Sequence, residues 1–214
     1  MTSPLFVIMT RPPRTGKNKT RLLPTLGPDL TAALHEAMLT DVLDTVASTP
    51  LDMHICVAGD PQHAFFDPWK PRATIEAQTE GDLGARLRAA LRDGATRKVI
   101  ALGADAPTLP TALLHALAMS EQQVTIVPAK DGGYVSIALN GPHWGIFEDI
   151  EWSTDRVLKQ TLERTKALEL TIAVLPEWYD IDEAEDLEHL STELRNLPAD
   201  TAPHTRAVLE RRTQ

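Results

Sequence analysis

Five cations lie between positions 11 and 21, directly after an apolar run over residues 5–9. They are Arg11, Arg14, Lys17, Lys19 and Arg21. The chain as a whole is acidic, with 21 Lys and Arg against 30 Asp and Glu and a formal net charge of -9. A cationic loop in such a chain needs an anionic partner, and arginine forks and lysine point charges both match phosphate oxygens. The loop is therefore predicted to bind a phosphorylated ligand, with a solvated basic turn as the alternative.

The loop does not have the spacing of a standard P-loop, because Gly16-Lys17 is followed by Asn18 and no glycine precedes Gly16. Backbone amides at a glycine can still cradle phosphate beside cationic side chains. The residues predicted to bind substrate here are Arg11, Gly16, Lys19, Thr20 and Arg21.

Three aspartates are placed for oxygen chemistry. Asp105 follows an apolar run over residues 98–103, Asp131 opens an Asp-Gly-Gly-Tyr turn, and Asp180 precedes a late acidic segment. Mg²⁺ and Mn²⁺ prefer oxygen ligands and bridge phosphates. Asp105 is predicted as the metal ligand and a catalytic residue, with Asp131 or Asp180 as further ligands. Asp131 is also the candidate general base. The structural alternatives are a turn cap for Asp105 and a simple hairpin for Asp131.

Glycines flank two of the predicted ligand contacts. Gly81, Asp82 and Gly84 open a helix that includes Arg86, and glycines permit close backbone approach at a helix N-terminus that favours anions. Gly132 and Gly133 let the chain turn sharply so that Asp131 faces a ligand. An ordinary helix start and an ordinary hairpin are the competing interpretations.

Polar residues at two further helix starts complete the candidates. Ser153 or Thr154 is predicted to cap a helix running to about residue 166 and to contact an anionic acceptor. Asp182, with Glu185 three residues later, resembles a capping box, so Asp182 is predicted to be structural.

Hydrophobic periodicity predicts alternating strands and helices. The predicted strands cover residues 5–9, 54–58, 74–77, 98–103, 124–128, 135–139 and 170–175, and the predicted helices cover 28–47, 83–92, 110–119, 154–166 and 183–194. This alternation predicts an α/β fold, a three-layer α/β/α arrangement around a Rossmann-like, mostly parallel sheet. Ligands of such sheets bind beyond the carboxyl ends of the strands. One domain is expected over residues 1–197, followed by a polar, loosely ordered tail over 198–214.

Composition limits the classes of function. The negative charge argues against nucleic-acid binding, and no apolar run is long enough to span a membrane. The N-terminus does not resemble a signal peptide, so a cytoplasmic location is expected. The single Cys56 lies in a strand-like run and is predicted to be buried and inert, and no Cys-His grouping indicates zinc. Asp41 lies on an apolar helix stripe, where it is either partly exposed or orients a loop cation.

Taken in order, these motifs resemble a bacterial family of transferases with the GT-A, or nucleotide-diphospho-sugar transferase, fold. The matching segments are Met9–Leu23, Gly81–Leu87, Gly103–Pro110, Asp131–Tyr134, Phe147–Thr161 and Asp180–Asp182. The family usually has Ser at the position of Ala104 and Thr at the position of Glu183, a change expected to move the helix cap.

The resemblance implies a metal-dependent, glycosyltransferase-like enzyme that uses Mg²⁺ or Mn²⁺, a nucleoside diphosphate-sugar donor and a small-molecule acceptor. A guanylyltransferase-like nucleotidyltransferase that releases pyrophosphate is the alternative, because a triphosphate would use five loop cations more fully. A nucleotide-binding module without turnover is the third hypothesis. The sequence leaves the base, the sugar, the acceptor and the oligomeric state open.

Overall fold

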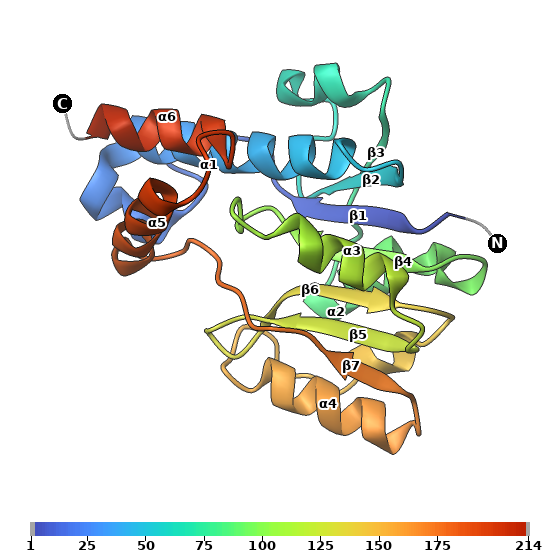
Figure 1. Cartoon of the computed structure of the whole chain (residues 1–214). Helices are drawn as coiled ribbons and strands as arrows, with labels where there is room; N and C mark the ends of the chain where they lie inside the picture. The colour runs from blue at the N-terminus through green and yellow to red at the C-terminus, as the bar shows by residue number, and fades with distance from the viewer. Residues whose placement is uncertain (1–2, 213–214) are drawn as a thin grey trace.

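A seven-stranded sheet with strand order β3-β2-β1-β4-β6-β5-β7 runs through the computed structural model, which describes residues 3–212 (Figure 1). The strands are β1 (Leu5–Thr10), β2 (Asp52–Val57), β3 (Ala73–Ala77), β4 (Val99–Gly103), β5 (Val124–Pro128), β6 (Tyr134–Leu139) and β7 (Ile172–Val174). Each corresponds to a predicted strand, with bounds that differ by a few residues.

The sheet is mostly parallel, as predicted. β1 pairs in parallel with β2 and β4, β2 with β3, and β5 with β7. β6 runs antiparallel to both β4 and β5. β5 and β6 therefore form a hairpin inside the sheet, and the carboxyl ends of β1, β4 and β5 meet at one edge.

Helices cover both faces of the sheet. The α-helices are α1 (Leu23–Ala47), α2 (Leu83–Ala90), α3 (Thr111–Met119), α4 (Val157–Ala167), α5 (Ala184–Asn196) and α6 (Pro203–Arg212). Short 3-10 helices are η1 (Thr20–Leu22), η2 (Ala64–Trp69), η3 (Arg92–Ala95) and η4 (Trp144–Phe147). α1 and α3 pack with one face of the sheet, and α2 and η4 with the other. The predicted three-layer arrangement is confirmed.

Buried side chains alternate between the two faces of β1. Phe6 and Ile8 belong to the core shared with α1 and α3, and Leu5 and Val7 belong to the core shared with α2. A strand buried on both faces reads as a continuous apolar run, which is the pattern found at the start of the sequence.

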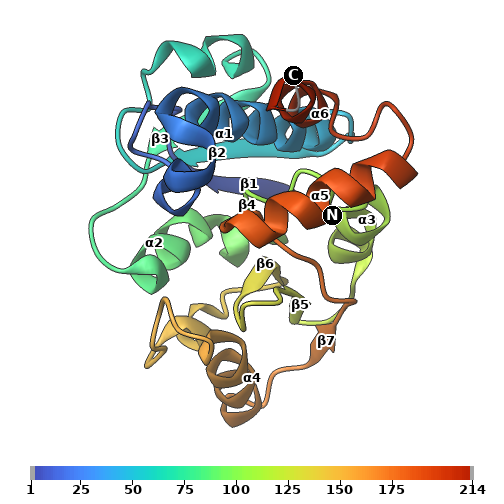
Figure 2. The same ribbon diagram turned by 90° about the vertical axis from the view of Figure 1, so that its left-hand side faces the viewer.

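The C-terminal segment is a packed helix, so the prediction of a loosely ordered tail is wrong. Val208 and Leu209 of α6 are buried in a third core with Leu34 and Met38 of α1, and α5 contributes to the same core. Figure 1 shows α6 lying along α1. Figure 2 views the edge where β1 and β4 end, with the start of α1, α2 and α5 around it.

Within the described residues, no helix is long and apolar enough to cross a membrane.

Asp41 explains how α6 is attached. Its carboxylate is 2% exposed and accepts hydrogen bonds from the backbone N–H groups of His204 (3.1 Å) and Thr205 (2.7 Å) at the start of α6. The first N–H groups of a helix lack partners within the helix, and a negative charge there is favourable. Both sequence interpretations of Asp41 are wrong, because it caps a helix that was not predicted.

Replacing Asp41 with Ala should lower the free energy of unfolding by about 1 to 3 kcal/mol, the range for losing a helix cap made by a buried carboxylate. Urea denaturation at pH 7 measures the change. Asp44→Ala is the matched control, because Asp44 pairs with the half-exposed His204 at 3.4 Å, and its loss should cost less than about 1 kcal/mol. Equal effects of the two substitutions would contradict the capping role.

Candidate active site

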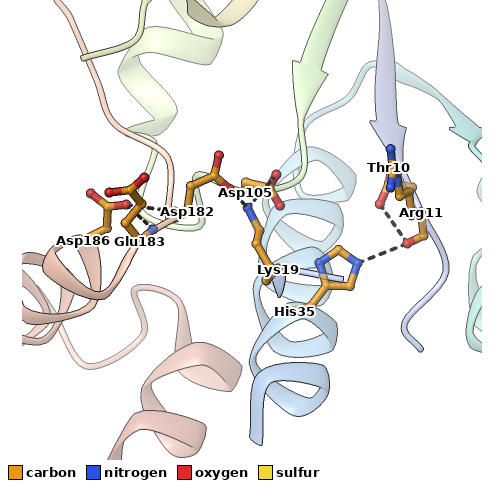
Figure 3. A network of polar contacts seen from close by, with 8 residues as sticks. All are labelled: Thr10, Arg11, Lys19, His35, Asp105, Asp182, Glu183 and Asp186. Carbon is orange, nitrogen blue, oxygen red and sulfur yellow. Dashed lines mark hydrogen bonds and ion pairs between the residues drawn. The ribbon is translucent and has the colours of Figure 1, made fainter. Parts of the chain in front are cut away.

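The Lys19 ammonium lies between two carboxylates. Its Nζ is 2.8 Å from Oδ2 of Asp105 and 2.5 Å from Oδ1 of Asp182, and the Lys19 side chain is only 6% exposed (Figure 3). Lys19 has left-handed backbone angles, with φ 49°, which are uncommon for a residue other than glycine. The loop is thus folded so that one of its cations turns inward.

Three segments distant in the sequence meet at this ion pair. The loop after β1 carries Lys19, the segment after β4 carries Asp105, and the segment before α5 carries Asp182. The Ile181 N–H donates to the Asp105 carbonyl at 2.9 Å, and Arg21 pairs with Glu183 at 3.2 Å. The first contact joins the segment before α5 to the end of β4, and the second joins the start of α5 to the loop after β1.

Asp182 takes part in the site because the helix cap lies one residue later than predicted. α5 has Glu183 as its N-cap in a capping box with Asp186. The Asp186 carboxylate accepts from the backbone N–H groups of Asp182 (2.9 Å) and Glu183 (2.7 Å). The predicted capping box of Asp182 and Glu185 is therefore wrong. Glu183 itself is the N-cap, so the expected displacement of the cap from this position does not occur. The Asp182 side chain is left free to face Lys19.

Nearby carboxylates shift the pKa values of Lys19 and Asp180. Burial alone would lower the pKa of Lys19, but Asp105 and Asp182 outweigh it and raise that pKa above its usual value. Burial, with the nearby charges of Asp182 and Asp131, raises the pKa of Asp180 to about 6. Asp182 is thus close enough to influence both Lys19 and Asp180.

A cavity of about 390 Å³ opens beside Lys19, within the range of small-molecule sites. Its carboxylates are Asp105 and Asp182. Five cations also line it: Arg11, Lys17, Lys19, Arg21 and Arg86. Thr20 lines it as well, so most of the predicted phosphate-binding residues are brought together. Gly16 does not line it and instead has φ 68° in the turn where the Lys17 N–H donates to the Arg14 carbonyl.

A second cavity, of about 130 Å³, adjoins the first at Asp105. Asp105 and Asp180 are its charged lining residues, and Ser136 and Tyr134 are among its polar ones. Its remaining lining is largely apolar, including Leu83 and Leu87 of α2. Within the part of the chain that the structure describes, no Lys, Arg or His lines this second cavity.

His35 lines the first cavity and was not predicted. It is 5% exposed, and its Nε2 lies 3.2 Å from the Arg11 carbonyl oxygen (Figure 3). Because a carbonyl can only accept, Nε2 carries the proton and Nδ1 is an acceptor. Among the described residues Nδ1 is buried without a hydrogen-bond partner. Burial lowers the pKa of His35. Its place on a helix stripe gave no sequence signal beyond that of a core residue.

The residues predicted at the start of α2 have structural contacts. Asp82 caps α2 by accepting from the Ala85 N–H at 2.8 Å, and the Gly81 carbonyl accepts from Arg86 Nε at 3.0 Å. A Cβ at Gly84 would lie 2.7 Å from Nε1 of Trp152. Gly84 therefore makes room for an indole. Of the predicted set, Arg86 alone lines either of the two cavities.

Asp131 lies at the tip of the β5–β6 hairpin, in agreement with the alternative interpretation of this turn as a simple hairpin. Its Oδ1 accepts from the Gly133 N–H at 2.8 Å. A Cβ at Gly132, which has φ +87°, would lie 2.2 Å from the Asp155 carbonyl oxygen. Gly132 packs the hairpin on the turn before α4, and neither glycine lines either cavity.

Ser153 and Thr154 do not cap α4, contrary to the prediction. The helix begins at Val157 with Arg156 at the N-cap. Ser153 has φ 64°, and Thr154 Oγ1 donates to the Glu151 carbonyl at 2.7 Å and accepts from the Arg156 N–H at 3.3 Å. Neither residue lines either cavity, so their contact with an acceptor stays a prediction.

Cys56 is buried, as predicted, and burial raises its pKa. Contrary to the expectation of no Cys-His grouping, the sheet brings its Sγ, His54 and Glu76 together, with one possible ligand atom from each within 4.8 Å of the others. Glu76 is already held by Arg92 through hydrogen bonds of 2.8 and 3.0 Å. This group is consistent with a satisfied polar cluster under β2 and β3.

The carboxylates around Lys19 fit a divalent cation. Asp105 and Asp182 already stabilise a positive charge at one point, and burial, followed by the like charges of Asp182 and Asp131, disfavours the ionised form of Asp180. Ligand atoms of Asp105, Asp131 and Asp180 do not all fall within 4.8 Å of one another among the described residues. Asp182, which shares the Lys19 ammonium with Asp105, is therefore added to the candidate ligands, and the ligand roles predicted for Asp131 and Asp180 stay predictions.

The fold is that of the nucleotide-diphospho-sugar transferases, as predicted. The structure superposes with a TM-score of 0.90 on a candidate nucleotide-diphospho-sugar transferase from Desulfovibrio desulfuricans G20, at 27% identity over 100% of this chain and 96% of that chain. A family comparison matches residues 41–154. The chain belongs to the family described as "Uncharacterized protein conserved in bacteria (DUF2064)".

More distant structures share the fold. The inositol-1-phosphate CTP transferase of T. maritima has a TM-score of 0.59 at 10% identity, with 98% of each chain covered. Rv0371c of Mycobacterium tuberculosis H37Rv, in complex with manganese, has a TM-score of 0.57 at 15% identity over 88% of this chain and 98% of that chain. A search of curated protein sequences finds no match.

Replacing Gly132 with Ala should destabilise the fold by more than about 2 kcal/mol, because a clash with fixed backbone adds to the cost of a positive φ. Gly16→Ala is the control: it also has a positive φ, with nothing within 4 Å of the added Cβ, and should cost about 1 kcal/mol. Chemical denaturation measures both. Similar losses would show that the Asp155 contact does not constrain the hairpin.

The metal-free chain should gain more stability from Asp180→Asn at pH 7.5 than at pH 5. A pKa of about 6 against an ordinary 3.8 means that the folded state holds the proton more tightly, so ionisation between these pH values costs folding free energy. The amide should add about 1 to 2 kcal/mol at pH 7.5. Thermal unfolding with a chelator at both pH values tests this, and a destabilisation at pH 7.5 would contradict it.

Proposed function

We propose that the protein is a metal-dependent glycosyltransferase, an enzyme of the transferase class that moves a sugar from a nucleoside diphosphate-sugar to an acceptor. The observation that carries this proposal is the contrast between the two adjoining cavities. The first is lined by five cations and the second by no described cation. A diphosphate suits the first cavity, and an uncharged sugar beyond it suits the second.

Loop cations and a divalent ion would share the diphosphate. Asp105 and Asp182 would hold Mg²⁺ or Mn²⁺, which would neutralise the charge that develops on the departing diphosphate. Lys19 and Arg21 would contact the phosphate oxygens through charge-assisted hydrogen bonds. His35 would keep the end of β1 in place through the Arg11 carbonyl.

Carboxylates at the far end of the site would handle the acceptor's proton. Asp180 lines the second cavity, and Asp131 is close enough to influence its pKa. We assign the general base to this pair, with the Asp180 side chain facing the cavity. Carboxylate oxygens would also accept hydrogen bonds from sugar hydroxyls. The proposal places the enzyme in the cytoplasm and includes a small-molecule acceptor.

Nucleotidyl transfer is the second candidate. It is favoured by the number of loop cations and by the fold shared with a CTP transferase. A phosphorylated acceptor would have to approach Asp105 and Asp180 in a cavity without a described cation. Repulsion between the acceptor's phosphate and these two carboxylates is unfavourable in a partly buried site. We therefore propose glycosyl transfer first.

A panel of nucleoside diphosphate-sugars and nucleoside triphosphates, each with and without Mn²⁺, tests the proposal. We expect one diphosphate-sugar with Mn²⁺ to raise the melting temperature, because a ligand of the native state stabilises it by mass action. Incubation with that donor should release nucleoside diphosphate and no pyrophosphate. Asp105→Asn should abolish the metal dependence, whereas Asp149→Asn, at a carboxylate that is 85% exposed, should not. Release of pyrophosphate from a triphosphate would overturn glycosyl transfer.

A further inference from the structure

The Lys19 ammonium occupies the position that a divalent ion would need. Its Nζ lies 2.8 Å from Asp105 Oδ2 and 2.5 Å from Asp182 Oδ1. Divalent ions bind carboxylate oxygens at about 2.0 to 2.6 Å. An ion that used these same two oxygens would fall almost on the ammonium, so the two cations exclude each other.

We propose that Lys19 is a built-in occupant of the metal position, and that metal and nucleotide bind cooperatively because the ion displaces this ammonium toward the phosphate cavity. The inference rests on the proposed function and adds how the site is regulated. In the free chain, the Lys19 ammonium is paired with both carboxylates. In the loaded enzyme, the same ammonium becomes a phosphate ligand.

The metal alone binds weakly on this account. Displaced from the carboxylates, the Lys19 ammonium enters a cavity whose other charged lining residues, Asp105 and Asp182 apart, are Arg11, Lys17, Arg21 and Arg86. Repulsion from these cations opposes the displacement unless an anion is present. A diphosphate in the cavity removes this penalty, so it strengthens metal binding.

Without the metal, phosphate also binds less tightly than it would if all of the cavity's cations were available. Two loop cations are neutralised in the free chain, Lys19 by Asp105 and Asp182, and Arg21 by Glu183. A metal on the two aspartates would return Lys19 to the cavity. The coupling is reciprocal by thermodynamic necessity, so the metal must strengthen nucleotide binding by the same factor.

The movement that this coupling needs is small. Lys19 lines the cavity already, and its four-carbon stem can turn the ammonium without moving the loop backbone. His35 lines the same cavity, and its Nδ1 is a buried acceptor without a partner among the described residues.

Mn²⁺ titration of the full chain, followed by the electron paramagnetic resonance signal of free Mn²⁺, tests the proposal without nucleotide. Lys19→Met removes the charge and keeps much of the length. We expect it to bind Mn²⁺ about tenfold more tightly than the wild type, within the range of known couplings. Lys19→Arg should bind Mn²⁺ weakly, like the wild type. Lys17→Met, a charge loss in the same cavity, should change Mn²⁺ affinity much less.

The titration is repeated with UDP, GDP, ADP and CDP in turn. The diphosphate that binds should tighten Mn²⁺ binding to the wild type by about tenfold and to Lys19→Met by a much smaller factor. Because Lys19→Met leaves two carboxylates unpaired, its folding is checked by circular dichroism. As a second measurement, Mn²⁺ should raise its melting temperature more than that of the wild type.

The outcomes separate this inference from the proposed function. Equal, tight Mn²⁺ binding by the wild type and Lys19→Met, lost in Asp105→Asn, would keep the metal site and overturn the competition. Weaker Mn²⁺ binding by Lys19→Met would also overturn it, because Lys19 would then support the ion. No binding that depends on Asp105 in any variant would overturn both the competition and the metal-dependent function.

Discussion

One buried ammonium between two carboxylates organises this molecule. Lys19 is nearly inaccessible, and removing such a charge from water is costly unless its partners are well placed. Asp105 and Asp182 meet that requirement from segments that are far from Lys19 in the sequence. Presenting Asp182 depends on α5, which packs with α6 on the first half of α1. Asp41 holds α6 in turn, so the C-terminal helices support the site even though they lie outside the sheet.

The sheet and its edge could be predicted because each strand carries its own signal. Continuous apolar runs such as residues 5–9 and 98–103 are typical of strands buried on both faces, and parallel strands bring their carboxyl ends to one edge. That rule was enough to place the Lys19 loop and Asp105 together. The ordered motifs also supported the fold, which the superposition confirms.

Other features could not be predicted, because the local sequence supports two arrangements equally or gives no signal for the correct one. Asp182 with Glu185 and Glu183 with Asp186 have the same spacing, and packing against the end of β4 selects the second pair. Asp41 has no recognisable partner in the sequence, because its N–H donors lie 163 and 164 residues away. Of the buried residues of α6, only Val208 and Leu209 are large and apolar, too few to predict a helix. The glycines at 84 and 132 have tertiary neighbours, and they resemble ligand-contacting glycines only when read in isolation.

A crystal structure with Mn²⁺ and a nucleoside diphosphate, with the ion located by its anomalous scattering, tests the central claim most directly. The account predicts an anomalous peak within coordination distance of both Asp105 and Asp182. It also predicts the Lys19 ammonium on a phosphate oxygen and the diphosphate in the cationic cavity. A peak elsewhere, with Lys19 still between the two aspartates, would contradict it.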